Sequence, residues 1–179
     1  AGRLIASLES AVIREDLWKA EDATPAFLYE VLAAQAGQGE INEFLLLKCL
    51  GHEDARLRAF AVRLWLQHAA WPEENASPDD EEDFIRRFAN AVNDPHPRVR
   101  LEAVVGAGYL KNAMAVKLAL GVLDHPRDRF IDYALANTVR ALKPSWAPAL
   151  EAGQLTFEGN AAHLAFLLQT DGNADTAGA

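Results

Sequence analysis

The stretch NDPHPRVRLEAVVGAGYLK, residues 93–111, decides how this chain folds. Pro95 and Pro97 lack a backbone N–H and disfavour helix at the residues before them, so a preceding helix must end here. Asp94 can accept hydrogen bonds from exposed N–H groups in the turn. An apolar helical pattern follows, and its small residues permit close helix packing: Ala103, Gly106, Ala107 and Gly108. The stretch therefore predicts a tight turn between two helices.

Related stretches occur before and after it, GHEDARLRAFAVRLWLQHA at 51–69 and LDHPRDRFIDYALANTVRALK at 123–143. Each has a short acidic or proline-bearing turn, then an arginine, then an alanine-rich helix. We align Arg58, Arg100 and Arg129, which spaces the units by 42 and 29 residues; a polar loop predicted at 71–83 accounts for the longer spacing. Apolar helices are predicted before the turns, at 40–50, 83–92 and 112–123. Helix pairs repeated at such intervals predict an α-solenoid.

The rest of the chain is also helical in its pattern, without a convincing alternating strand. Helices are predicted over 3–19 and over ATPAFLYEVLAAQA at 23–36, where Thr24 caps and Pro25 takes the first helical position. We expect a single all-α domain over residues 1–168. The polar end of the chain, 169–179, is predicted to be a flexible tail or linker.

The turn-plus-arginine pattern resembles the HEAT-repeat family. Asp94, Pro95, Val99, Arg100 and Ala103 match the hallmark of that family, and the resemblance covers about residues 40–150. It implies an α-solenoid, an armadillo-like superhelix of HEAT-like helical hairpins, in which turn residues hold neighbouring hairpins together. The candidates for this structural role are Asp94, Pro95, Arg58, Arg100, Asp124 and Arg129. The resemblance implies a fold and says little about function.

Residues 119–157 have a narrower resemblance, to the HEAT segment of multidomain proteins of planctomycete-type bacteria that join a β-propeller, a HEAT segment and a c-type cytochrome. The matching residues are Asp124, His125, Pro126, Asp128, Asp132, Tyr133, Ala134, Thr138, Pro144 and Trp146. This resemblance implies a module of a larger exported redox-type protein, in the periplasm or secreted; without it a cytoplasmic location is expected. The chain has no Cys-x-x-Cys-His motif, so any haem would belong to flanking domains.

Net charge restricts the partners that can be expected. The formal charge is -9 and the pI is near 5.0, which argues against general binding to nucleic acids or anionic membranes. The longest apolar runs are far below the roughly 20 residues that span a bilayer. The single cysteine, Cys49, lies in an apolar run and is expected in the core.

Three sets of polar residues are candidates for chemical sites. His52, His96 and His125 occupy turns without metal-ligand spacing and are expected to be exposed. The acidic run at 79–83 lacks the alternation and glycine of a calcium loop, and favours a helix N-terminus. Asp128 and Asp132 share a helix face, but Asp128 reads as an ordinary acid at a helix start. We therefore expect no catalytic, cofactor or metal site.

A non-catalytic interaction scaffold remains the expected function. Its partner would be another protein or flanking domains of the same polypeptide, and the candidate contact residues are Arg63, Trp65 and Tyr109. One alternative is a HEAT-like DNA glycosylase of the alkylpurine type, with Trp65, Arg100 and Asp132 in its groove. Another alternative is a lyase or chaperone for a bilin chromophore, which no specific residue supports.

Overall fold

The computed structural model describes residues 23–69, 72, 77–157 and 159–176, with side chains to residue 172. Every regular element in these ranges is a helix, and none of the described residues forms a strand. The all-α prediction is therefore confirmed for this part of the chain. The helix predicted over 3–19 lies outside it.

The chain divides into two compact units between Trp65 and Leu66, within helix α5 (Ala55–His68). The first unit contains α3 (Pro25–Gln38), α4 (Glu43–Leu50) and most of α5. The second unit contains the helices from α6 onward. The single domain over 1–168 and the superhelix of hairpins stay predictions.

Helix α3 begins where its sequence predicts and ends two residues later than predicted, at Gln38. The Thr24 hydroxyl accepts a hydrogen bond from the Phe27 N–H at 3.3 Å, and Pro25 is the first helical residue. Gly39 ends the helix with φ of 77°, a left-handed conformation that glycine adopts without strain. Asn42 caps α4 in the same way, through the Leu45 N–H at 3.1 Å.

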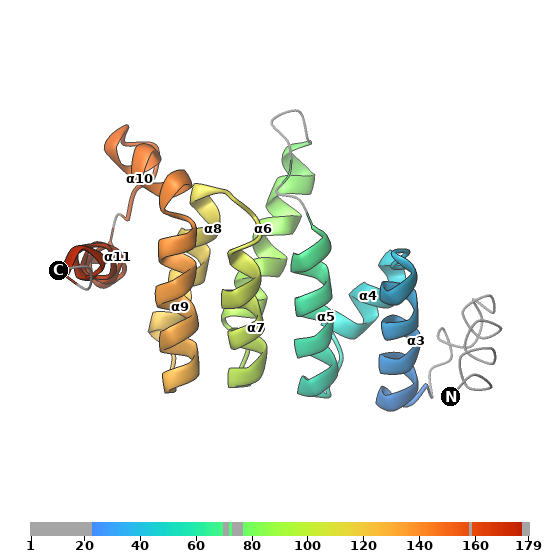
Figure 1. Ribbon diagram of the computed structural model, residues 1–179. Coiled ribbons are helices and arrows are strands. Elements are labelled where there is room, and N and C mark those ends of the chain that lie inside the picture. The colour runs from blue at the N-terminus through green and yellow to red at the C-terminus, as the bar shows by residue number, and fades with distance from the viewer. Residues whose placement is uncertain (1–22, 70–71, 73–76, 158, 177–179) are drawn as a thin grey trace. The chain divides into compact units, whose positions relative to one another are not determined.

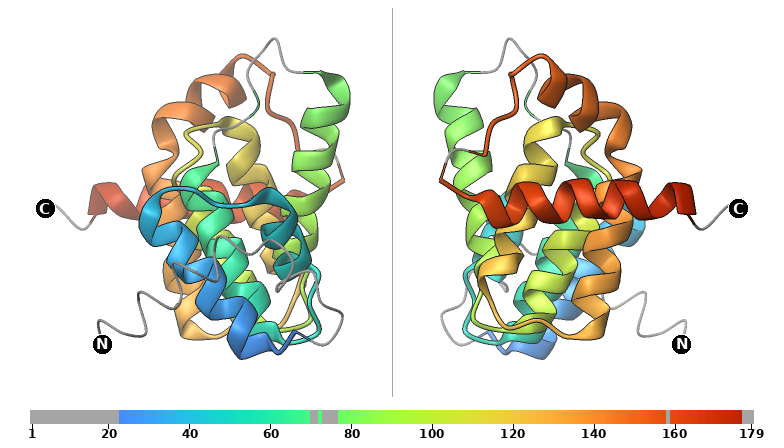
Figure 2. Two further views of the ribbon diagram at one scale, coloured as in Figure 1. Left: turned by 90° about the vertical axis from the view of Figure 1, so that its right-hand side faces the viewer. Right: turned by 90° about the vertical axis from the view of Figure 1, so that its left-hand side faces the viewer.

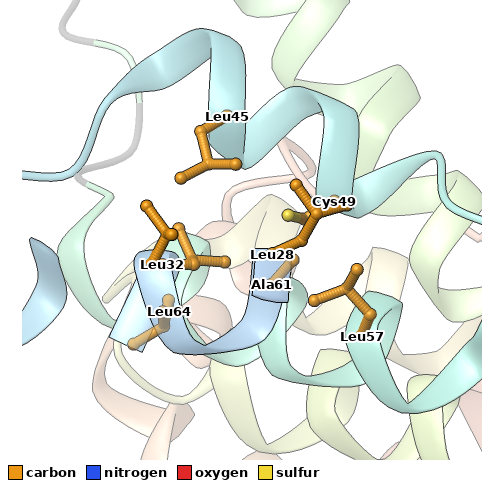
Figure 3. Packing of buried hydrophobic residues seen from close by; sticks show 8 residues of the cluster. Leu28, Leu32, Leu45, Cys49, Leu57, Ala61 and Leu64 are labelled. Carbon is orange, nitrogen blue, oxygen red and sulfur yellow. The ribbon is translucent and has the colours of Figure 1, made fainter. Parts of the chain in front are cut away.

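The core of the first unit is an apolar cluster in which α3, α4 and α5 meet (Figure 3). Its members are Leu28, Val31, Leu32, Leu45, Cys49, Leu57, Ala61 and Leu64. Cys49 is fully buried, and this burial raises the pKa of its thiol to about 11. The cysteine is therefore a core residue, as its sequence context predicts.

The second unit contains two packed pairs of helices followed by two further helices. The first pair is α6 (Pro78–Val92) and α7 (Pro97–Ala107); the second is α8 (Ala113–Leu120), extended by the short η1 (Gly121–Asp124), and α9 (Arg129–Ala141). Helices α7 and α9 lie side by side, with α6 and α8 behind them (Figure 1). Helix α10 (Lys143–Glu151) follows, and α11 (Ala161–Thr176) crosses α9 (Figure 2).

Small residues and buried hydrogen bonds bring the helices of this unit close together. A Cβ atom at Gly106 would lie 2.5 Å from Leu66 Cδ1, so the missing side chain makes room for that leucine. The Thr138 hydroxyl of α9 donates to the Val104 carbonyl of α7 at 2.8 Å. Trp146 is buried and donates from Nε1 to the Val139 carbonyl at 2.7 Å. The small residues of α7 thus allow the close helix packing that the sequence predicts.

Two boundaries differ from the predicted ones by five residues or more. Helix α6 begins at Pro78, within the stretch predicted as a loop to residue 83. This start agrees with the helix N-terminus expected at the acidic run 79–83, because the Ser77 hydroxyl caps α6 and the acids of its first turn favour the positive end of the helix dipole. The tail expected from residue 169 is helical as far as Thr176. Thr170 is buried and Asp171 pairs with Lys143 at 2.5 Å, so tertiary contacts hold this polar segment in α11.

Candidate functional site

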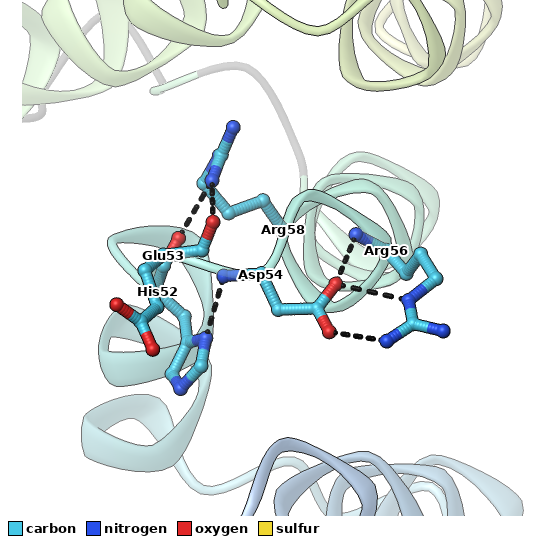
Figure 4. A network of polar contacts seen from close by, with 5 residues as sticks. All are labelled: His52, Glu53, Asp54, Arg56 and Arg58. Atoms are coloured by element: carbon cyan, nitrogen blue, oxygen red, sulfur yellow. Dashed lines mark hydrogen bonds and ion pairs between the residues drawn. The ribbon is translucent and has the colours of Figure 1, made fainter.

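Arg58 holds the turn that precedes its own helix (Figure 4). Its Nη1 donates to the carbonyl oxygens of His52 and Glu53, both at 2.8 Å. Those carbonyls belong to the residues three and two positions before α5 begins at Ala55. The guanidinium thus satisfies backbone acceptors that the turn leaves without helical partners.

Arg100 makes the same two bonds and adds a third. Its Nη1 donates to the carbonyls of Asp94 at 2.7 Å and Pro95 at 3.1 Å, again three and two positions before the helix. Its Nη2 reaches the carbonyl of Pro126 at 2.7 Å, in the turn before α9. The side chain is buried, with 4% of its surface exposed. The structural role predicted for Arg100 is therefore what its contacts provide.

Arg129 does not belong to this set, and its alignment with Arg58 and Arg100 was wrong. Arg58 and Arg100 are each the fourth residue of their helices, whereas Arg129 is the first residue of α9. The fourth residue of α9 is Asp132, which accepts from Arg127 Nε at 2.7 Å. Arg129 instead lies over the Phe130 ring, 4.8 Å from its centroid. The spacing between the last two units is thus 32 residues, from Pro97 to Arg129.

The remaining turn candidates have structural contacts. The Asp94 carboxylate accepts from the His96 N–H at 2.8 Å, and Pro95 offers only its carbonyl, to Arg100. Asp124 contacts Nε2 of the buried His163 at 3.2 Å, which connects η1 to α11. These residues hold the second unit together.

Several of the histidines and carboxylates considered as chemical sites bind the backbone, whereas His125 Nε2 contacts the Asn93 side chain at 2.7 Å. His52 and His96 each accept through Nδ1 from an N–H two residues later, at 2.9 Å and 3.2 Å. Asp128 caps α9 by accepting from the Phe130 and Ile131 N–H groups. In the described ranges no group of three or more His, Cys, Asp or Glu side chains is placed to hold a metal ion.

One shallow cavity of about 260 Å³ lies in the first unit, lined by Pro25, Ala26, Tyr29, Asp54, Arg56 and Leu57. Its carboxylate is already engaged, since Asp54 accepts two side-chain hydrogen bonds from Arg56, at 3.1 Å and 2.7 Å (Figure 4). These bonds hold the pKa of Asp54 well below its usual range. The cavity is smaller than the ~300–1,000 Å³ typical of ligand sites.

The three predicted contact residues do not share one surface of one helix. Arg63 is exposed and Trp65 half-buried on α5, and residues two apart on a helix point in nearly opposite directions. Tyr109 belongs to the second unit, directly after α7, and is 53% exposed. Arg63 and Trp65 are not placed to act together, because they point away from each other.

The sequence did not single out an apolar surface next to Tyr109, which we call the α7–α9 face. It comprises Leu101, Val105, Tyr109, Phe130 and Tyr133. Phe130 and Tyr133 are 57% and 72% exposed, and Val105 is also exposed. Leu101, which is half-buried, and Tyr133 are each the fifth residue of their helices, and α7 and α9 lie side by side. An alignment of α7 and α9 by their first residues pairs Leu101 with Tyr133, which the alignment by arginines did not.

Two arginines at the ends of α9 lack a carboxylate partner in the described part of the chain. Arg129 stacks on Phe130, and Arg140 contacts Asn137 at 3.4 Å. The exposed acid on this helix, Asp132, is already paired with Arg127. On α7, Arg98 is paired with Glu102 at 3.0 Å. The Asp128 carboxylate lies at the N-terminus of the same helix, so the four arginines next to the α7–α9 face exceed the three carboxylates there by one positive charge.

Comparisons with protein-family models, with curated proteins and with solved structures give no match to this chain. Among the described helices, none has the length and apolar character to cross a membrane. The function is therefore inferred from the residues themselves.

Proposed function

We propose that this chain is a non-catalytic docking scaffold built from HEAT-like hairpins. It binds a protein partner, or flanking domains of the same polypeptide, through the α7–α9 face. The exposed aromatic side chains of Phe130 and Tyr133 carry this proposal. Contiguous exposed apolar surface is costly in water and marks interaction sites in soluble domains.

The polar candidates support a role without catalysis, because each already serves the fold. Arg58 and Arg100 donate to turn carbonyls, and Asp128 caps a helix. None of them directs an unengaged reactive group into a cavity. Such an arrangement suits a rigid surface better than an active site.

Photo-crosslinking tests the proposal directly. A photoreactive amino acid at Tyr133 of the full chain should form adducts with a partner protein in cells that produce it. The matched control is the same group at Phe44, which is 74% exposed on α4 of the first unit. Equal labelling at both positions, or adducts at neither, would count against the proposal.

The alternative as a DNA glycosylase has weaker support. Arg100, one of its three expected groove residues, is buried with its guanidinium on backbone carbonyls. Asp132 is occupied by Arg127. Titration with a DNA duplex at low salt separates the two functions, since phosphate contacts are strongest there; saturable binding would favour the glycosylase.

We also propose, from the narrower resemblance, that the scaffold is a module of a larger exported redox-type protein, in the periplasm or secreted. Reading the complete gene around this segment tests that context. An export signal and a Cys-x-x-Cys-His domain in the same frame would support it. A reading frame that encodes neither would rule out the exported redox-type protein, and the partner would then be a separate protein.

A further inference from the structure

We infer that the α7–α9 face binds an acidic peptide segment of another protein, one whose carboxylates flank apolar side chains. The inference rests on the proposed scaffold function and specifies the chemistry of the partner. The partner segment must have both apolar side chains and negative charge. Different residues of the face and of its edge indicate these two properties.

The apolar requirement comes from the spacing of the exposed side chains. Val105 lies one turn after Leu101 on α7, so the two share one side of that helix, and the exposed Tyr109 follows in the turn after the helix ends at Ala107. Phe130 and Tyr133 form the corresponding stripe on α9. Adjacent packed helices lie roughly 8–10 Å apart. A partner segment with large apolar side chains can therefore contact both stripes.

The charge requirement comes from the arginines at the two ends of α9. Within the described residues, neither Arg129 nor Arg140 has an ion-pair partner, whereas Arg127 and Arg98 are paired with Asp132 and Glu102. Unpaired guanidiniums beside an apolar stripe favour carboxylates with apolar neighbours.

The local charge balance strengthens this preference. Residues 93–143 contain eight Lys or Arg against five Asp or Glu, a net charge of +3 that becomes +2 when Asp171, the partner of Lys143, is included, in a chain whose net charge is -9. Opposite potentials attract partners and like potentials repel them. An acidic segment is therefore favoured here over a basic one.

The test uses the full chain and two fluorescein-labelled helical peptides with the same Leu and Phe positions. One peptide carries Glu at its polar positions and the other Lys. Fluorescence anisotropy should give at least roughly tenfold tighter binding of the Glu peptide, with affinity falling as salt rises. Equal binding of both peptides, or binding of neither, would overturn the inference.

Variants locate the binding on the protein. The double change Phe130→Ala and Tyr133→Ala should weaken Glu-peptide binding by roughly tenfold or more, since aromatic anchors dominate such contacts. Arg129→Glu with Arg140→Glu should weaken it and reduce its salt dependence. The controls Phe44→Ala, in α4, and Arg86→Glu, in α6, should leave it unchanged. Circular dichroism verifies that each variant is folded, as expected for exposed positions.

The outcomes also separate this inference from the scaffold function. Crosslinking at Tyr133 without Glu-peptide binding would reject the acidic partner and retain the scaffold. Failure of both experiments would reject both. A concentration-dependent dimer that Tyr133→Ala abolishes, measured by sedimentation velocity, would make the face a self-interface and overturn the inference.

Discussion

Arg100 donates a hydrogen bond from Nη2 to the carbonyl oxygen of Pro126 at 2.7 Å, across 26 residues of sequence, and so joins the start of α7 to the turn before α9. The same guanidinium binds the carbonyls of its own turn. A single buried side chain therefore connects the α6–α7 and α8–α9 pairs. Its two terminal nitrogens lie apart in a planar fork, so Nη1 binds its own turn while Nη2 binds the next one; the single nitrogen of a lysine ammonium does not reproduce this geometry.

Arg100→Met should destabilise the protein by roughly 2–4 kcal/mol, because three turn carbonyls lose a charged donor. Urea unfolding followed by circular dichroism measures the change. Arg129→Ala is the matched control: its side chain makes no turn contact, so the change should stay within about 0.5 kcal/mol. An equal fall in the free energy of unfolding of the two variants would mean that the hydrogen bonds from Arg100 to the turn carbonyls do not stabilise the fold.

Gly106→Ala should destabilise the second unit by roughly 1–3 kcal/mol through overpacking. The added Cβ would lie 2.5 Å from Leu66 Cδ1 and 2.6 Å from Leu66 Cβ, so the leucine or its helix must move. Gly172→Ala in α11 is the control, since nothing lies within 4 Å of the new Cβ. That change should stabilise by up to about 1 kcal/mol, through helix propensity alone. Opposite signs in thermal unfolding are the expected result; a stabilising Gly106→Ala would contradict the close contact.

Lys111→Gly should stabilise the protein by roughly 0.5–1 kcal/mol, because Lys111 has φ of 47°, in the left-handed region. The lysine is exposed after α7, so little packing is lost. Lys111→Ala removes the same side chain and keeps the strain. Only the glycine variant should raise the midpoint of urea unfolding, and a similar rise for alanine would assign the effect to the side chain.

The Cys49 thiol should resist alkylation by iodoacetamide in the native protein at pH 8 and react readily in denaturant. It is fully buried, and burial raises its pKa from an ordinary value of 9.0 to about 11, so the reactive thiolate is scarce. Mass spectrometry of the labelled protein measures this. Rapid native labelling would contradict the packing of α4 against α3 and α5.

The same shift predicts how stability depends on pH. Between pH 9 and 11 the unfolded chain releases the Cys49 proton and the folded chain keeps it, so the free energy of unfolding should fall as pH rises. Other groups also titrate there, so the comparison is with Cys49→Ala, in which the decline should be shallower. Equal slopes in the two proteins would mean that the thiol does not ionise differently on unfolding.

Local sequence determined the helices, their caps and the turn chemistry. Thr24 and Asp128 cap helices through N–H groups only two or three residues away, so a short stretch contains both the donors and the acceptor. The two arginines of the first turns are also local, because each binds carbonyls five and six residues before it. The position of Cys49 in the core follows from the apolar run around it.

Only tertiary structure decided the register of the third unit, the end of α11 and the identity of the exposed face. The arginine pattern placed Arg129 beside Arg100, but α9 begins at Arg129, so Asp132 has the position of Arg100 and the buried Ile131 has that of Val99. Helix α7 is buried on most of its circumference by neighbouring helices, so its narrow exposed stripe cannot be found from a hydrophobic period alone. The reason is general: caps and turns depend on atoms a few residues apart, whereas burial and surface depend on contacts between helices that are distant in sequence.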